Sequence, residues 1–294
     1  MKRKIGVCDF SFPAGGVVGV EMAGRAGFQG MQIMDAPNMR EGFPLLNPVV
    51  REMYLETAEK YAMEFQGLNL AALCFSNIMG SPLNSSNGDI IKNYINKTVE
   101  TCKLMGIKTV MMNVNNIHFI SKPSPEIMKN IKDILRYAND RLEDIGVVLS
   151  IETCIPAPMF HDIRREISEN IKMCLDIANP VYHGIGYPPD LIRQYGLDCI
   201  DHFHIKDFKK GYFGYLTQDC EMCYPGEGGA GFWECAKIIR EGGFEGWFIS
   251  ESIYTLPGFY EEDDPVRDPI EAAKKDAAIM RKAFPENETP DKGL

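Results

Sequence analysis

Four side chains that can bind a metal ion stand at or near the ends of four apolar runs in the second half of the chain. The runs are GVVLSIE, IKMCLDI, HFHIKD and GWFISES, and they carry Glu152, Asp176, His204 and Glu251. Three ionised carboxylates that converge on one place repel each other and raise each other's pKa unless a cation holds them. Together with the histidine, they predict one bound divalent ion.

The donor types indicate which ion this is. Three oxygens and one nitrogen suit a hard or borderline ion, so we expect Mn²⁺ first, with Mg²⁺ or Co²⁺ as alternatives, and Zn²⁺ stays open. Each residue alone has a simpler explanation, such as a helix cap or an ion pair with a lysine. The repetition on four neighbouring strands favours the metal. His202 and Asp207 flank His204, and we expect them to support the ligands from behind.

The elements that must position these residues follow from the rhythm of the chain. Apolar runs, the expected strands, lie at 4–8, 30–34, 68–73, 109–114, 146–152, 171–177, 202–207 and 246–252. Amphipathic segments, the expected helices, lie at 18–26, 48–65, 89–105, 124–145, 162–170, 189–195, 232–241 and 265–284. Strands that alternate with helices imply parallel pairing through right-handed crossovers.

Eight such units predict an α/β fold, a closed (β/α)8 TIM barrel. We expect a single domain over 1–294 with a polar tail at 285–294. A doubly wound open sheet is the alternative, but no GxGxxG follows the first strand. In a barrel the chemistry gathers at the carboxyl ends of the strands, where the four candidate ligands lie.

Composition excludes several classes of partner. The chain has 294 residues, 45% of them hydrophobic, and a net charge of −10. This charge argues against nucleic acid, which is held mainly by Lys and Arg. No apolar run reaches the roughly 20 residues of a membrane span, and the run after MKRK is too short for a signal peptide. Nine cysteines in a long chain suit a reducing compartment, so we expect a cytoplasmic protein. Cys220 and Cys223 form a lone CxxC. We expect them to be ordinary loop cysteines, with a redox pair or a zinc half-site as the alternatives.

Several segments resemble the xylose-isomerase-like barrel superfamily, which includes sugar isomerases, ketose 3-epimerases, inosose dehydratases and apurinic endonucleases. The likeness runs over about residues 4–255 and rests on GFQGMQIM (27–34), IETC (151–154), LDIAN (175–179), HFHIKD (202–207), PGEGGAGFWE (225–234) and GWFISES (246–252). It implies that Glu152, Asp176, His204 and Glu251 bind one metal. In the ketose 3-epimerases the first and last of these are also the acid–base pair.

Other residues near the four candidate ligands differ from the epimerase pattern. Pro158 and Asn179 stand where typical ketose 3-epimerases have a carboxylate and a histidine, and Asn179 resembles the ketose-phosphate branch instead. Lys210 stands where some relatives place a substrate-binding arginine. We assign substrate contacts to Asn179, Lys210, Lys206 and His161, which follows the fifth strand. The resemblance therefore leaves the identity of the sugar open.

The resemblance implies a divalent-metal-dependent sugar isomerase or epimerase that removes a proton next to a carbonyl, with a small carbohydrate as substrate. A lyase that uses the same enolate chemistry is the alternative, either like inosose dehydratase or as the barrel subunit of a C-glycoside-cleaving enzyme with a second chain. The acidic net charge argues against an endonuclease, and the four candidate metal ligands argue against a non-catalytic barrel. The PGEGGAG segment could bind phosphate before a helix. We also expect a homo-oligomer.

Overall fold

The strands form the predicted barrel. The computed structural model of the chain describes residues 2–35, 42–70, 73, 78–114, 124–209, 221–261 and 263–286. Its eight long strands are hydrogen-bonded in the order β1-β10-β7-β6-β5-β4-β3-β2, a closed barrel. They are β1 (Lys4–Cys8), β2 (Gly30–Ile33), β3 (Glu64–Asn69), β4 (Thr109–Asn113), β5 (Val148–Glu152), β6 (Ile171–Asp176), β7 (Ile200–Ile205) and β10 (Trp247–Ser250). The predicted (β/α)8 fold is confirmed.

Helices alternate with these strands, as a parallel sheet requires. They are α1 (Gly16–Ala26), α2 (Pro48–Lys60), α4 (Ser86–Met105), α6 (Pro125–Glu143), α7 (Ala157–Glu166), α8 (Asn179–Tyr182), α9 (Pro188–Tyr195), α10 (Phe232–Glu241) and α11 (Pro269–Ala283). Side chains of Ser85, Ser124 and Asp268 cap the starts of α4, α6 and α11 by accepting backbone N–H groups. Such caps satisfy donors that have no partner inside a helix.

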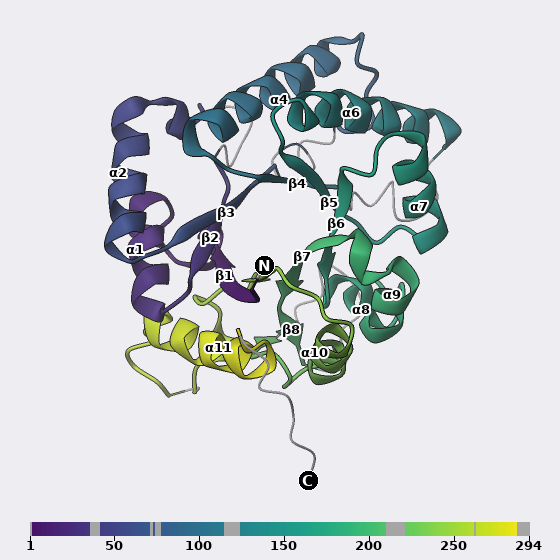
Figure 1. Ribbon diagram of the computed structural model, residues 1–294. Coiled ribbons are helices and arrows are strands. Elements are labelled where there is room, and N and C mark those ends of the chain that lie inside the picture. The colour runs from purple at the N-terminus through teal and green to yellow at the C-terminus, as the bar shows by residue number, and fades with distance from the viewer. Residues whose placement is uncertain are drawn as a thin grey trace. The chain divides into compact units, whose positions relative to one another are not determined.

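The described chain divides into two compact units, and each has its own core. Unit 1 comprises Met1–Met31, Lys60–Glu64 and Asp176–Leu294. In it β10 pairs in parallel with both β1 and β7, and α11 packs beside α1 (Figure 1). The Phe248 ring of β10 stacks on Phe284 at 3.7 Å between centroids. This aromatic packing fixes β10, the strand that leads to Glu251.

Unit 2 comprises Gln32–Glu59 and Phe65–Leu175. Within it β3, β4, β5 and β6 pair in parallel in that order. Helix α6 buries Ile131, Ile134, Leu135, Ala138 and Leu142, the spacing of one helical face. It lies beside α4 (Figure 1). The expectation of one domain over 1–294 stays a prediction.

The structure corrects some of the expected boundaries. Strand β3 starts at Glu64 and not at residue 68, because α2 ends at Lys60 and Ala62 turns the chain with a positive φ of 52°. Helix α7 begins at Ala157, five residues before the expected start. The connection between β7 and α10, where no further strand is expected, contains a short antiparallel pair, β8 (Asp207–Phe208) with β9 (Met222–Cys223).

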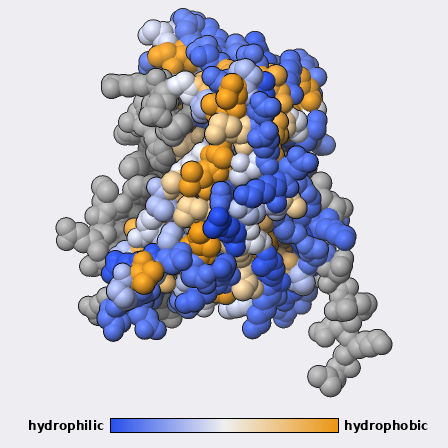
Figure 2. Space-filling view, turned by 90° about the vertical axis from the view of Figure 1, so that its left-hand side faces the viewer, coloured by the Kyte–Doolittle hydropathy of each residue, from blue (hydrophilic) through white to orange (hydrophobic). Residues whose placement is uncertain are grey.

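One face of the molecule carries a mixture of polar and apolar side chains. Figure 2 shows the face that carries α2, where hydrophobic residues lie among hydrophilic ones. Val49, Met53 and Leu55 of α2 are exposed. Across the described residues, every helix is too short or too polar to span a bilayer.

Candidate metal centre

Asp176 ends β6 with one of its carboxylate oxygens already committed. Its Oδ1 accepts N–H groups from Ala178 at 2.7 Å and Asn179 at 2.8 Å, which starts α8. These bonds use both lone pairs of Oδ1 and fix the rotation of the carboxylate. Asp176 is only 3% exposed, so Oδ2 is held in place as the oxygen available to a cation.

His204 and Glu251 come from the paired strands β7 and β10. His204 lies opposite Ile249 in the register, and the Glu251 N–H donates to Ile205 O at 2.9 Å. The ladder therefore continues to Glu251, one residue past the end of β10. His204 Nδ1 lies 3.4 Å from Glu251 Oε2. His204 is fully buried, whereas the Glu251 side chain is 16% exposed.

Lys206 brings a positive charge to this pair of acids. Its Nζ lies 2.7 Å from Asp176 Oδ2 and donates a hydrogen bond to Glu251 Oε2. Burial raises the pKa of the Asp176 carboxyl, and Lys206 opposes this only in part. Burial also acts to raise the pKa of Glu251, but Lys206 and His204 outweigh it and hold that pKa well below its ordinary value. Glu251, which keeps some contact with solvent, is thus more acidic than Asp176.

Glu152 ends β5 and is held by its neighbour on β4. Asn113 lies opposite Glu152 in the register and donates a hydrogen bond from Nδ2 to Glu152 Oε2. Glu152 is 2% exposed. A neutral amide that donates to one oxygen orients a carboxylate without cancelling its charge.

The four predicted ligands form one group. One ligand atom from each of Glu152, Asp176, His204 and Glu251 lies within 4.8 Å of the others. Three carboxylates at a buried site carry more negative charge than the one ammonium of Lys206 can offset, which favours the binding of a divalent cation. The donor set, its burial and its charge therefore fit a divalent metal ion.

Comparison with known families identifies the family of the chain. The family model described as "Xylose isomerase-like TIM barrel" matches residues 20–283. The chain belongs to this family. A comparison with curated proteins found no match.

Solved structures similar to this xylose isomerase-like barrel include sugar-modifying enzymes. One, described as IOLI protein with a binding zinc atom, is 18% identical, with 97% of this chain and 99% of that chain covered and a TM-score of 0.69. D-allulose 3-epimerase from Methylomonas sp. in complex with D-allulose is 13% identical, with 96% and 98% covered and a TM-score of 0.69. A D-tagatose 3-epimerase-like protein is 20% identical, with 95% and 96% covered and a TM-score of 0.69.

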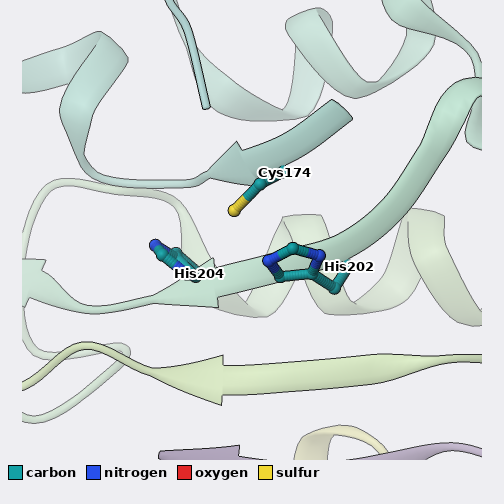
Figure 3. A group of neighbouring side chains, drawn as sticks. All are labelled: Cys174, His202 and His204. Atoms are coloured by element: carbon teal, nitrogen blue, oxygen red, sulfur yellow. The ribbon is translucent and has the colours of Figure 1, made fainter. Parts of the chain in front are cut away.

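A second set of potential ligands in the barrel shares His204. Cys174, His202 and His204 also offer atoms within 4.8 Å of one another (Figure 3). His202 Nδ1 lies 2.7 Å from Asp201 Oδ2, and burial lowers the pKa of the His202 imidazole, which favours the neutral ring. Cys174 was not among the predicted ligands, although it stands two residues before Asp176 and thus on the same face of β6. Sulfur and nitrogen donors suit a softer ion than the carboxylate set does.

Most of the remaining predicted site residues lie in the part of the chain that the structure describes. Asn179 follows Asp176 and bonds to it through its backbone, and His161 lies in α7 with its ring 5.8 Å from that of Phe160. Asp207 accepts backbone N–H groups from Phe208, Gly226, Gly228 and Ala230. These last three amides belong to PGEGGAG, so they are engaged by a carboxylate, which argues against the phosphate site considered for this segment. Lys210 and Cys220 lie outside the described residues, and burial raises the pKa of the Cys223 thiol to about 12.

Proposed function

We propose that this xylose isomerase-like barrel is a divalent-metal-dependent sugar isomerase or epimerase that moves a proton at the carbon next to a carbonyl. The single observation that carries the proposal is the grouping of Glu152, Asp176, His204 and Glu251 within 4.8 Å of one another. When bound, a divalent ion supplies Lewis-acid stabilisation of negative charge on the substrate oxygens. The zinc atom described for one similar structure supports the choice of a metal.

In this proposal the two glutamates move the protons. Glu251 is the most solvent-accessible of the three acids, with a side chain that is 16% exposed, so it is suited to remove a proton from the substrate. Glu152 is oriented by the hydrogen bond that Asn113 donates to its Oε2, and we assign it the return of a proton to the substrate. General acid–base catalysis of this kind contributes about 10²–10⁴-fold to the rate. Asp176 and His204 then serve as ligands.

We further propose a ketose as substrate and manganese as the metal. Two of the similar structures are described as a D-allulose 3-epimerase and a D-tagatose 3-epimerase-like protein, which supports a ketose. The three-oxygen, one-nitrogen donor set supports Mn²⁺ ahead of a thiophilic ion. Asn179, Lys206, Lys210 and His161 are proposed to contact the sugar, with His202 and Asp207 behind the ligands.

Solvent-deuterium uptake at the substrate carbon tests the proposal. Purified protein with Mn²⁺ is incubated in D₂O with free ketoses, ketose phosphates, inososes and 3-keto glycosides, and exchange is followed by NMR. We expect exchange with a ketose, and a loss of about 10²–10⁴-fold in Glu251→Gln and in Glu152→Gln. Glu241→Gln, which changes an exposed carboxylate at the end of α10, is the matched control and should exchange normally.

The product separates the possible reactions. Exchange accompanied by inversion of configuration at the carbon next to the carbonyl supports an epimerase, and exchange accompanied by a shifted carbonyl supports an isomerase. Loss of a leaving group points to a lyase. Normal exchange in Glu251→Gln contradicts the proposed role of that glutamate.

A further inference from the structure

Lys206 places one buried ammonium group on two candidate metal ligands. The residue is 8% exposed, and its Nζ contacts Asp176 Oδ2 at 2.7 Å and donates to Glu251 Oε2. Its backbone directly follows β7 and precedes Asp207, whose carboxylate accepts four backbone N–H groups. The fold itself therefore fixes the position from which this side chain reaches the acids.

The oxygens that Lys206 contacts are those that a metal ion would need. Oδ1 of Asp176 already accepts two backbone N–H groups, so Oδ2 is the oxygen left for a cation. Oε2 of Glu251 lies 3.4 Å from His204 Nδ1, so it faces the candidate nitrogen ligand. A divalent ion bound to these two oxygens would need the same lone pairs that the Lys206 ammonium now contacts.

We propose that Lys206 is a resident cation that competes with the divalent metal for Asp176 and Glu251. The inference rests on the proposed function, since it assigns a competitor to the same metal site. Two cations on the same oxygens repel each other strongly at a buried site, so metal binding displaces the ammonium from the acids. Before metal binds, the ammonium offsets the repulsion between the two carboxylates. Lys206 thereby sets the metal concentration at which the site fills.

Calorimetric titration of the metal-stripped, full-length protein with Mn²⁺ tests this inference without any assay of activity. Lys206→Met removes the ammonium and keeps an unbranched side chain. We expect this variant to bind Mn²⁺ at least about tenfold more tightly than the wild type, because hydrogen bonds between charged groups no longer have to be broken. The melting temperature of its metal-stripped form should fall, because two buried carboxylates lose their counter-charge.

Lys209→Met is the matched control. Lys209 lies three residues further on and pairs with Glu221 at the surface, where its side chain is 50% exposed. This variant should bind Mn²⁺ as the wild type does. A second test variant, Lys206→Gln, keeps a hydrogen-bond donor but no charge, and it should also bind the ion more tightly.

The outcomes separate the inference from the proposed function. Equal or weaker Mn²⁺ affinity in both Lys206 variants overturns the inference while the metal site stands. A wild-type chain that binds no Mn²⁺ at all overturns the proposed function and the inference with it.

Discussion

At the scale of single residues, Asp276 of α11 is a buried acid behind the candidate site. It is fully buried, and its Oδ2 accepts hydrogen bonds from Ser250 Oγ and Tyr254 Oη, both at 2.7 Å. Ser250 directly precedes Glu251. Burial raises the pKa of the Asp276 carboxyl, and hydrogen bonds from Ser250 and Tyr254 oppose this only in part. Asp276 thus holds the end of β10 in place, although burial of its negative charge has an electrostatic cost.

This cost predicts a pH dependence of stability. The folded chain keeps the Asp276 proton to a higher pH than the unfolded chain, whose ordinary pKa is 3.8. The contribution of Asp276 to the free energy of unfolding therefore falls as pH rises above about 4. Urea unfolding of wild type and Asp276→Asn between about pH 4 and pH 7 should show the wild type losing stability relative to the variant. Each unit by which the pKa is raised is worth about 1.4 kcal/mol.

Asp264→Asn is the control of opposite sign. Asp264 is a partly exposed acid that accepts N–H groups from Val266 and Arg267, and these hold its pKa below the ordinary value. Relative to Asp264→Asn, the wild type should gain stability as pH rises. If the free energies of unfolding of the wild type and Asp276→Asn change in parallel with pH, the pKa of Asp276 is not raised by folding.

At this scale the sequence predicts ligands better than it predicts their supports. Glu152, Asp176, His204 and Glu251 could be chosen because each closes an apolar run, and strand ends converge in a barrel. The contact between Asn113 and Glu152 depends on the register of β4 against β5, which no local pattern contains. Asp276 could have been noticed, since it shares the apolar face of α11 with Ala273, Ala277 and Met280.

At the scale of elements, the connection after β7 is organised around Asp207. Its carboxylate accepts backbone N–H groups from Gly226, Gly228 and Ala230 at 3.0–3.1 Å. The approach is so close that a Cβ on Gly228 would lie 2.2 Å from Asp207 Oδ1 and 2.2 Å from Phe208 O. The segment between β9 and α10 therefore needs glycine so that the backbone can approach Asp207 closely, and not in order to bind the phosphate that PGEGGAG suggested.

Substitution of this glycine tests the arrangement. Gly228→Ser should lower the free energy of unfolding by more than about 2 kcal/mol, because the new side chain displaces the loop from buried hydrogen bonds. Gly15→Ser adds the same side chain at the N-cap of α1, where no atom lies within 4 Å of a built Cβ. Since serine is a favourable N-cap residue, this control should be neutral or slightly stabilising in urea unfolding. Equal losses in both variants would contradict the proposed tight approach.

Element boundaries show what periodicity can and cannot predict. The bounds of β1 and α10 agree with the expected 4–8 and 232–241, because a short apolar run and an amphipathic stripe have clear ends. For β3 the apolar run LNLAAL suggested 68–73, but the strand begins at Glu64, where turn residues 61–63 end the preceding helix. The β8–β9 pair joins Phe208 to Met222 across the intervening segment, so no local signal predicts it.

At the scale of the whole molecule, metal binding should couple to global stability. The candidate ligands come from four different strands that are far apart in the sequence, so unfolding separates them and the unfolded chain has little affinity for the ion. A ligand that binds only the folded chain stabilises it by about 2.7 kcal/mol at one hundred times its dissociation constant. For a chain of this size we expect saturating Mn²⁺ to raise the melting temperature by several degrees, and a chelator to reverse the change.

Variants locate the source of this stabilisation. Glu251→Gln should lose most of the Mn²⁺-dependent increase in melting temperature, because one of three carboxylate ligands becomes a neutral amide. Glu241→Gln should keep the full increase, since that carboxylate is exposed at the end of α10. Differential scanning fluorimetry with and without Mn²⁺ measures both. An undiminished increase in Glu251→Gln would mean that the ion binds elsewhere, and the Cys174, His202 and His204 set would then be the next site to test by the same measurement with Zn²⁺.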